Sequence, residues 1–184
     1  MRIFISGGCK NGKSFYAQHL AKQQQQGRSL YYVATMAATD SEDDERIARH
    51  QAERENWGFT TIEQPRNIHE ILESCNHNGS FLLDSLTALL ANEMFLPTGD
   101  IYENAAEKIA TELTDILNKV QNIVVVSDYI YSDAFMFDPL TEMYRKSLAQ
   151  LDSLTAAHCD VVLEIVNTQV VTHKGGGGIF EKID

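Results

Sequence analysis

The sequence predicts an α/β fold of three layers, in which a mostly parallel sheet carries helices on both of its faces. Short apolar runs of strand length alternate with longer stretches of helical periodicity, as in parallel sheets, where helices connect neighbouring strands. In addition, the first apolar run leads directly into a glycine-rich turn that opens a helix. Of the 184 residues 43% are hydrophobic, which suffices for one buried core, so we expect a single domain over residues 1–184.

Six apolar runs are expected to form the strands, at residues 3–6, 29–34, 80–83, 122–127, 160–166 and 169–173. The run Ile123-Val124-Val125-Val126 is apolar on both faces and is expected at the centre of the sheet. The last strand follows the fifth after a short Asn167-Thr168 turn, which predicts an antiparallel edge strand. Helices are expected over residues 14–25, 41–56, 68–75, 86–95, 104–120 and 140–158.

The first expected strand ends in a G-x-x-x-x-G-K-S motif, formed by Gly7, Gly8, Cys9, Lys10, Asn11, Gly12, Lys13 and Ser14. In such a loop the glycines let backbone N–H groups face an anion. The lysine adds positive charge for the β- and γ-phosphates, and the serine hydroxyl can ligate Mg²⁺. Because a strand precedes the motif and a helix follows it, the motif predicts a nucleoside triphosphate site and a fold of the P-loop NTPase type rather than a turn without a ligand.

Charge and cysteine content limit the partners that the chain can have. A net charge of −11 should repel nucleic acid and anionic lipid, so local groups must hold the phosphates. The three cysteines, Cys9, Cys75 and Cys159, lack metal-ligand spacing, and their odd number argues against a disulfide framework. The sequence shows neither a leader pattern nor an apolar stretch long enough to span a bilayer. We therefore expect a cytoplasmic protein with no nucleic-acid partner.

A second pattern lies on the helix expected over 41–56. Arg46, His50 and Arg54 recur at every fourth position and so share one face of that helix. A histidine between two arginines is a candidate anion site in an acidic protein. Acidic residues four positions before Arg46 and Arg49 fit a salt-bridged surface helix equally well, so the residues alone leave both interpretations open.

Asp84 closes the apolar run at 80–83. Phosphate-loop proteins place at this point the carboxylate that holds Mg²⁺. Asp84 is therefore the candidate magnesium partner of Ser14. It could instead cap the helix that begins at Leu86, or do both.

These motifs resemble the bifunctional adenosylcobinamide kinase and adenosylcobinamide-phosphate guanylyltransferase family of cobalamin biosynthesis. Besides the phosphate loop, the matching pieces are Y-V-A-T at 32–35, R-I-x-x-H-x-x-x-R at 46–54, T-x-E at 61–63 and L-L-D-S-L-T at 82–87. The second half departs from the family pattern. Its N-E-V-G run is replaced by S-D-Y-I at 127–130, and its R-D-x-x-G-x-x-N-Q helix keeps only Arg145.

The resemblance implies two reactions at one nucleotide site. In the first, with Lys13 as a catalytic residue, a nucleoside triphosphate phosphorylates the corrinoid adenosylcobinamide. In the second, GMP passes from GTP to adenosylcobinamide phosphate through a histidyl-GMP intermediate on His50. The resemblance also implies Mg²⁺, GTP or ATP as substrate, and a homotrimer. The further implied nucleotide contacts are Ala34, Thr35, Arg46, Arg54, Glu63 and Asp84.

Two alternatives stay open because the second half has diverged. The first is a P-loop kinase of another small acceptor, in which His50 only contacts an anion. The second is a diverged GTP-binding protein that has lost one or both activities.

Overall fold

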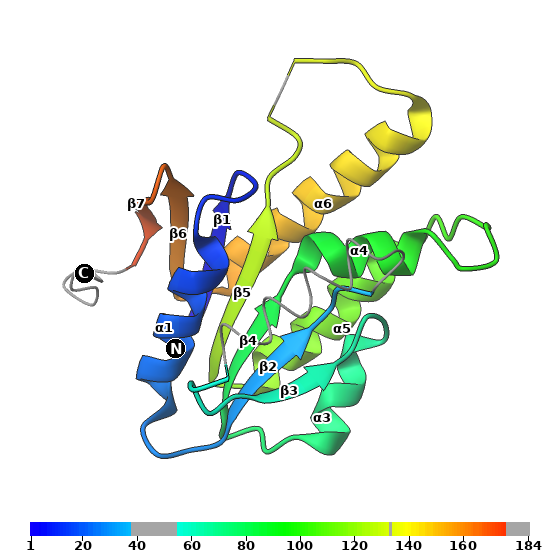
Figure 1. Ribbon diagram of the computed structural model, residues 1–184. Coiled ribbons are helices and arrows are strands. Elements are labelled where there is room, and N and C mark those ends of the chain that lie inside the picture. The colour runs from blue at the N-terminus through cyan, green and yellow to red at the C-terminus, as the bar shows by residue number, and fades with distance from the viewer. Residues whose placement is uncertain (38–54, 133, 176–184) are drawn as a thin grey trace.

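A computed structural model describes residues 1–37, 55–132 and 134–175, and within them seven strands form one sheet in the order β3-β2-β4-β5-β1-β6-β7 (Figure 1). The strands are β1 (Arg2–Gly7), β2 (Leu30–Ala34), β3 (Thr60–Glu63), β4 (Ser80–Asp84), β5 (Asn122–Asp128), β6 (Val161–Val166) and β7 (Gln169–Lys174). The helices are α1 (Lys13–Gln25), the 3-10 helix η1 (Ile68–Glu70), α3 (Ile71–Ser74), α4 (Leu86–Met94), α5 (Ala105–Lys119) and α6 (Pro139–His158).

The sheet confirms the predicted fold class. Neighbouring strands are parallel from β3 to β6, and β7 pairs with β6 in the antiparallel direction at the edge. The turn between β6 and β7 places both Asn167 and Thr168 in the left-handed region, which suits a tight hairpin turn. Strand β5 lies between β4 and β1, and its apolar run from Ile123 to Val126 is buried, as predicted.

Three elements differ from the expectations or could not be compared with them. Strand β3 was not predicted, because it lies at the sheet edge and is mostly exposed, so it carries no apolar run. The helix expected over 68–75 is divided into η1 and α3. The helix expected over 41–56 falls outside the described residues, except for residues 55 and 56, which form a turn.

Helices cover both faces of the sheet and build a core on each. On one face, α1 packs on the even-numbered residues of β5, such as Val124 and Val126, through Ala17 and Leu20. On the other face, α4, α5 and α6 pack on the odd-numbered ones (Figure 1). Successive strand residues point to opposite faces, so a strand apolar throughout, such as β5, is buried on both sides. Among the helices of the described ranges, none is long and apolar enough to cross a membrane.

The parallel strands end at one common edge. In register, Gly7 of β1 lies beside Asp128 of β5, whereas Asp84 of β4 lies beside Val126. The phosphate loop follows β1 at this edge. The sheet therefore brings together, beside the loop, residues that are far apart in sequence.

Candidate active site

The phosphate loop is fixed between β1 and the start of α1. A Cβ atom at Gly7 would lie 2.6 Å from the Ile165 carbonyl oxygen, so glycine is required there for space. The Asn11 side chain donates a hydrogen bond to the same carbonyl and ties the loop to β6. Gly12 is the N-cap residue of α1 with a φ of 90°, and the first turn of α1 has no acidic residue. The N–H groups and the dipole of α1 therefore favour an anion from outside the chain.

Lys13 is almost fully buried beneath this loop. Its ammonium group contacts Asp128 Oδ1 at 2.6 Å and donates a hydrogen bond to the Gly8 carbonyl at 2.6 Å. Asp128 ends β5 next to Gly7. The sequence interpretation did not assign Asp128 a role. The sequence did contain a signal for it, because Asp128 is an acidic residue at the end of the central apolar strand. The same pattern made Asp84 a candidate.

The two predicted magnesium donors lie on the same side of the sheet. Leu82 belongs to the core under α1, so Asp84, two residues further along β4, points to that face as well. Ser14 is half-buried in the first turn of α1. The Asp84 carboxylate accepts a hydrogen bond from the Tyr32 hydroxyl at 2.7 Å. Asp84 does not cap the next helix, because Ser85 is the N-cap residue of α4 and its hydroxyl accepts from the Ala88 N–H.

A hydroxyl and a carboxylate suit Mg²⁺, which in phosphate sites takes one or two protein oxygens together with phosphate and water oxygens. In the part of the chain that the structure describes, no group of three or more His, Cys, Asp or Glu side chains is arranged to hold a metal ion. Ser14 and Asp84 thus match a nucleotide-linked magnesium ion better than a metal held by protein alone.

The other predicted nucleotide contacts divide into four groups. Ala34 ends β2 level with Glu63 and Asp84, so these three lie at the same edge of the sheet as the loop. Thr35 is buried, and its hydroxyl exchanges hydrogen bonds of 2.7 Å with the backbone of Ser85, so it joins the ends of β2 and β4. Cys9, Lys10 and Gly12 of the loop are exposed. Arg46, His50 and Arg54 lie outside the described residues.

A buried carboxylate near Asp128, Asp152 of α6, was also missed. Its Oδ2 accepts a hydrogen bond from the Tyr131 hydroxyl at 2.8 Å, and its buried Oδ1 has no hydrogen-bond partner among the residues that the structure describes. Burial raises the pKa of Asp152 to about 6, the charge on Asp128 adds to the rise, and hydrogen bonding from Ser127 and Tyr131 opposes it.

Asp152→Asn is expected to stabilise the protein at neutral pH. The pKa of Asp152 is about 6 when folded, above the ordinary 3.8, so between these values the unfolded state binds fewer protons and stability falls as pH rises. Above pH 6 the neutral amide, which can still accept from Tyr131, should raise the free energy of unfolding by about 1–3 kcal/mol. Urea unfolding at pH 8 and pH 4 measures this, with the surface variant Asp115→Asn as control. A gain of equal size at both pH values would contradict the assignment.

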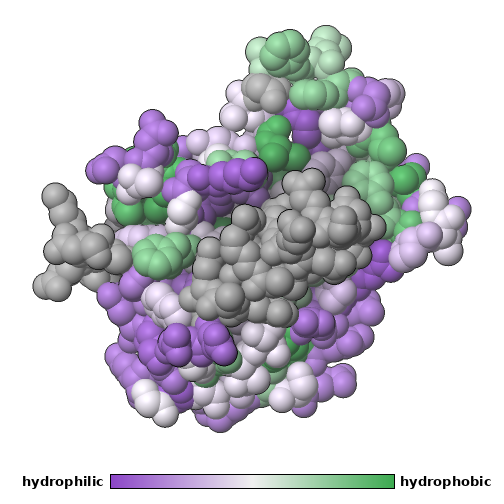
Figure 2. All heavy atoms as spheres, in the orientation of Figure 1, coloured by the Kyte–Doolittle hydropathy of each residue, from purple (hydrophilic) through white to green (hydrophobic). Residues whose placement is uncertain are grey.

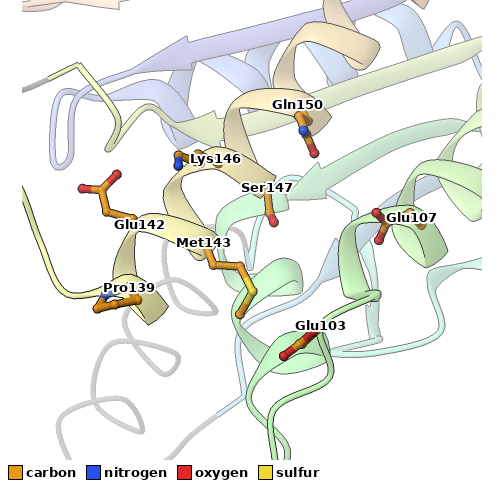
Figure 3. A pocket seen from close by; sticks show the side chains of 8 residues that line it. All are labelled: Glu103, Glu107, Pro139, Glu142, Met143, Lys146, Ser147 and Gln150. Carbon is orange, nitrogen blue, oxygen red and sulfur yellow. The ribbon is translucent and has the colours of Figure 1, made fainter.

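A cleft of about 470 Å³ lies between the beginning of α5 and the first three turns of α6 and is not part of this site (Figure 3). Glu103 and Glu107 line it from the α5 side, and Glu142, Lys146 and Gln150 line it from α6. Both helices cover the sheet face opposite α1. None of the lining residues of the cleft belongs to the phosphate loop or to the other predicted nucleotide contacts.

Solved structures of other proteins share this fold. The flagellar accessory protein FlaH from Methanocaldococcus jannaschii matches 95% of this chain and 78% of its own, with a TM-score of 0.52 and 14% identity. A KaiC-like protein from Pyrococcus horikoshii matches 95% of this chain and 79% of its own, with a TM-score of 0.52 and 11% identity. At such low identity these likenesses concern the fold alone.

Sequence comparison identifies the family. The profile described as cobinamide kinase / cobinamide phosphate guanyltransferase matches residues 3–172. The bifunctional adenosylcobalamin biosynthesis protein CobP of Pseudomonas aeruginosa is 30% identical over 164 residues, covering 88% of this chain and 91% of the relative. The corresponding CobU protein of Escherichia coli is 25% identical over 179 residues, covering 91% and 96%. The chain therefore belongs to the cobinamide kinase / cobinamide phosphate guanyltransferase family and is an enzyme, a kinase and nucleotidyltransferase of cobalamin biosynthesis.

Proposed function

We propose that this chain, as one domain, phosphorylates adenosylcobinamide and then transfers GMP from GTP to adenosylcobinamide phosphate, through a histidyl-GMP intermediate on His50. The observation that carries the proposal is the phosphate loop, whose buried Lys13 reaches the sheet edge where Asp84 and Asp128 end their strands. The family membership supports the choice of substrates.

In the first reaction a nucleoside triphosphate gives its γ-phosphoryl group to the hydroxyl of adenosylcobinamide. The loop N–H groups and Lys13 stabilise the negative charge on the transferring group and on the leaving diphosphate. Ser14 and Asp84 would hold Mg²⁺, which when bound offsets further phosphate charge. Ala34, Glu63 and Asp84 end their strands at the same edge of the sheet as the loop, which supports the placement of the nucleotide along that edge.

In the second reaction the neutral imidazole of His50 attacks the α-phosphorus of GTP, and pyrophosphate leaves. Adenosylcobinamide phosphate then displaces GMP from His50. Two transfers, each with a good nucleophile, replace one difficult step. Arg46 and Arg54 would neutralise the phosphates on either side, and the spacing of these three residues in the sequence supports this role.

We also propose that the chain works as a homotrimer in the cytoplasm. Figure 2 shows apolar residues gathered at the end of the molecule where α6 begins, and there Phe135 is 77% exposed and Met136 is 96% exposed. Exposed apolar residues that gather in one place favour contact with another protein surface. The cysteines Cys9, Cys75 and Cys159 are all free, which suits a reducing compartment.

The proposal is tested by identifying the products. The protein is incubated with adenosylcobinamide, Mg²⁺ and either ATP or GTP, and the corrinoid is analysed by mass spectrometry. We expect the added mass of one phosphate first and, with GTP, the added mass of GMP later. Phosphate addition alone would contradict the GMP-transfer half. No modified corrinoid, from a protein that binds GTP in calorimetry, would contradict both halves and favour another acceptor or a diverged GTP-binding protein.

A further inference from the structure

We propose that Asp128 is a catalytic residue of the phosphoryl transfer, which accepts the proton of the attacking hydroxyl group. The inference rests on the proposed kinase function and assigns a residue to a task that the phosphate loop alone does not perform. The loop and Lys13 stabilise charge on the phosphates, whereas the acceptor alcohol must also lose a proton.

The contact between Asp128 and Lys13 sets the position of the carboxylate relative to the nucleotide. Asp128 Oδ1 lies 2.6 Å from the Lys13 ammonium group. A phosphate-loop lysine binds β- and γ-phosphate oxygens at hydrogen-bond distance, about 2.8 Å. Two oxygens bound to the same ammonium group are at most about 5–6 Å apart. A γ-phosphate held by Lys13 therefore lies next to the Asp128 carboxylate, with room for one hydroxyl group between them.

The surroundings of Asp128 hold it in place and leave it accessible. Its backbone N–H donates to the Thr87 hydroxyl at 2.8 Å, and the Thr87 carbonyl accepts from the Tyr144 hydroxyl at 2.8 Å. The side chain of Asp128 keeps 27% of its surface exposed, at the edge where an acceptor must enter. A fixed carboxylate that is open to the acceptor fits a proton acceptor better than a purely structural ion pair does.

Two other carboxylates that the structure describes near this site, Asp84 and Asp152, fit the task less well. Asp84 lies one strand further from β1, level with Val126 rather than with Gly7, and its carboxylate is bound by Tyr32. Asp152 is only 3% exposed and is bound by Tyr131, so an acceptor could not reach it. Asp84 therefore suits the binding of Mg²⁺, and Asp128 suits contact with the hydroxyl group of the acceptor.

The proposed step is a displacement at the γ-phosphorus. The acceptor oxygen forms a bond to the γ-phosphorus, and the bond from that phosphorus to the β–γ bridging oxygen breaks. The hydroxyl proton passes to the Asp128 carboxylate and later to water, and the nucleoside diphosphate leaves. Lys13 keeps its contact with Asp128 Oδ1 while it holds the γ-phosphate, so the second carboxylate oxygen, Oδ2, is the one that accepts the proton.

The test compares Asp128→Asn and Asp128→Glu with wild type and with the surface control Asp100→Asn. For phosphorylation of adenosylcobinamide we expect kcat of Asp128→Asn to fall by about 10²–10³-fold. Its Kd for the triphosphate should stay equal or decrease, because a negative charge next to the γ-phosphate is lost. Asp128→Glu should recover part of kcat. The transfer of GMP to the protein, which needs no acceptor hydroxyl, should stay within a few-fold of wild type.

Two results would overturn the inference alone. A kcat of Asp128→Asn equal to that of wild type would leave Asp128 only as the partner of Lys13. A raised Mg²⁺ requirement, restored to full rate by excess Mg²⁺, would make it a metal-binding residue instead. Wild-type protein without kinase activity, in contrast, would contradict the proposed function and with it this inference.

Discussion

Lys13→Ala is expected to lower the rate of phosphoryl transfer by roughly 10³-fold. The Lys13 side chain is 6% exposed and its ammonium group is held at the loop by the Gly8 carbonyl and by Asp128. It is the cation of the loop that the motif places at the β- and γ-phosphates, where charge develops. Alanine removes that charge from a site with little water, where electrostatic interactions are strong.

The measurement is the steady-state rate with saturating triphosphate, together with the affinity for the triphosphate. Lys22→Ala is the matched control, since Lys22 is an exposed lysine in the last turn of the same helix and donates a hydrogen bond to the Trp57 carbonyl. The control should keep the wild-type rate. Thermal unfolding shows whether each variant is folded. A folded Lys13→Ala protein within tenfold of the wild-type rate would contradict the role of Lys13.

Much of the fold could be predicted because its signals are local. The apolar run of β5 is buried on both faces, and α1 follows a contiguous eight-residue motif, so sequence pattern and structure coincide there. β3 could not be predicted in this way, since an exposed edge strand needs backbone pairing with β2 and little burial of its own side chains. The sequence left open whether Asp84 also caps α4, because Asp84 and Ser85 are both good N-cap residues and only the geometry shows that Ser85 is the cap.

The site was predictable where its residues are adjacent in sequence and not where the sheet brings them together. The phosphate loop is one short motif. The pair of Lys13 and Asp128 joins residues 115 positions apart, and it depends on β5 lying next to β1, which no local pattern specifies. Asp152 on α6 is buried under Tyr131 for the same reason. Such contacts depend on the order of the strands in the sheet, and the role proposed for Asp128 rests on one of them.

His50→Ala is expected to abolish transfer of GMP to the protein completely. The histidine nitrogen is the atom that would form the bond to phosphorus, and alanine offers no replacement. His69→Ala is the matched control, because His69 is an exposed histidine of η1 and is not among the predicted site residues. The loss should concern only the GMP-transfer reaction, since phosphorylation of adenosylcobinamide uses the loop, Lys13 and Asp128.

The central claim is that two reactions share one nucleotide site and that His50 is the nucleophile of the second. Labelling with α-³²P-GTP and Mg²⁺, followed by denaturing electrophoresis, tests this claim most directly. Wild type and His69→Ala should carry a label that is labile in acid and stable in alkali, as expected for a phosphoramidate, and His50→Ala should carry none. Equal labelling of His50→Ala, or no label on wild-type protein that binds GTP, would contradict the claim.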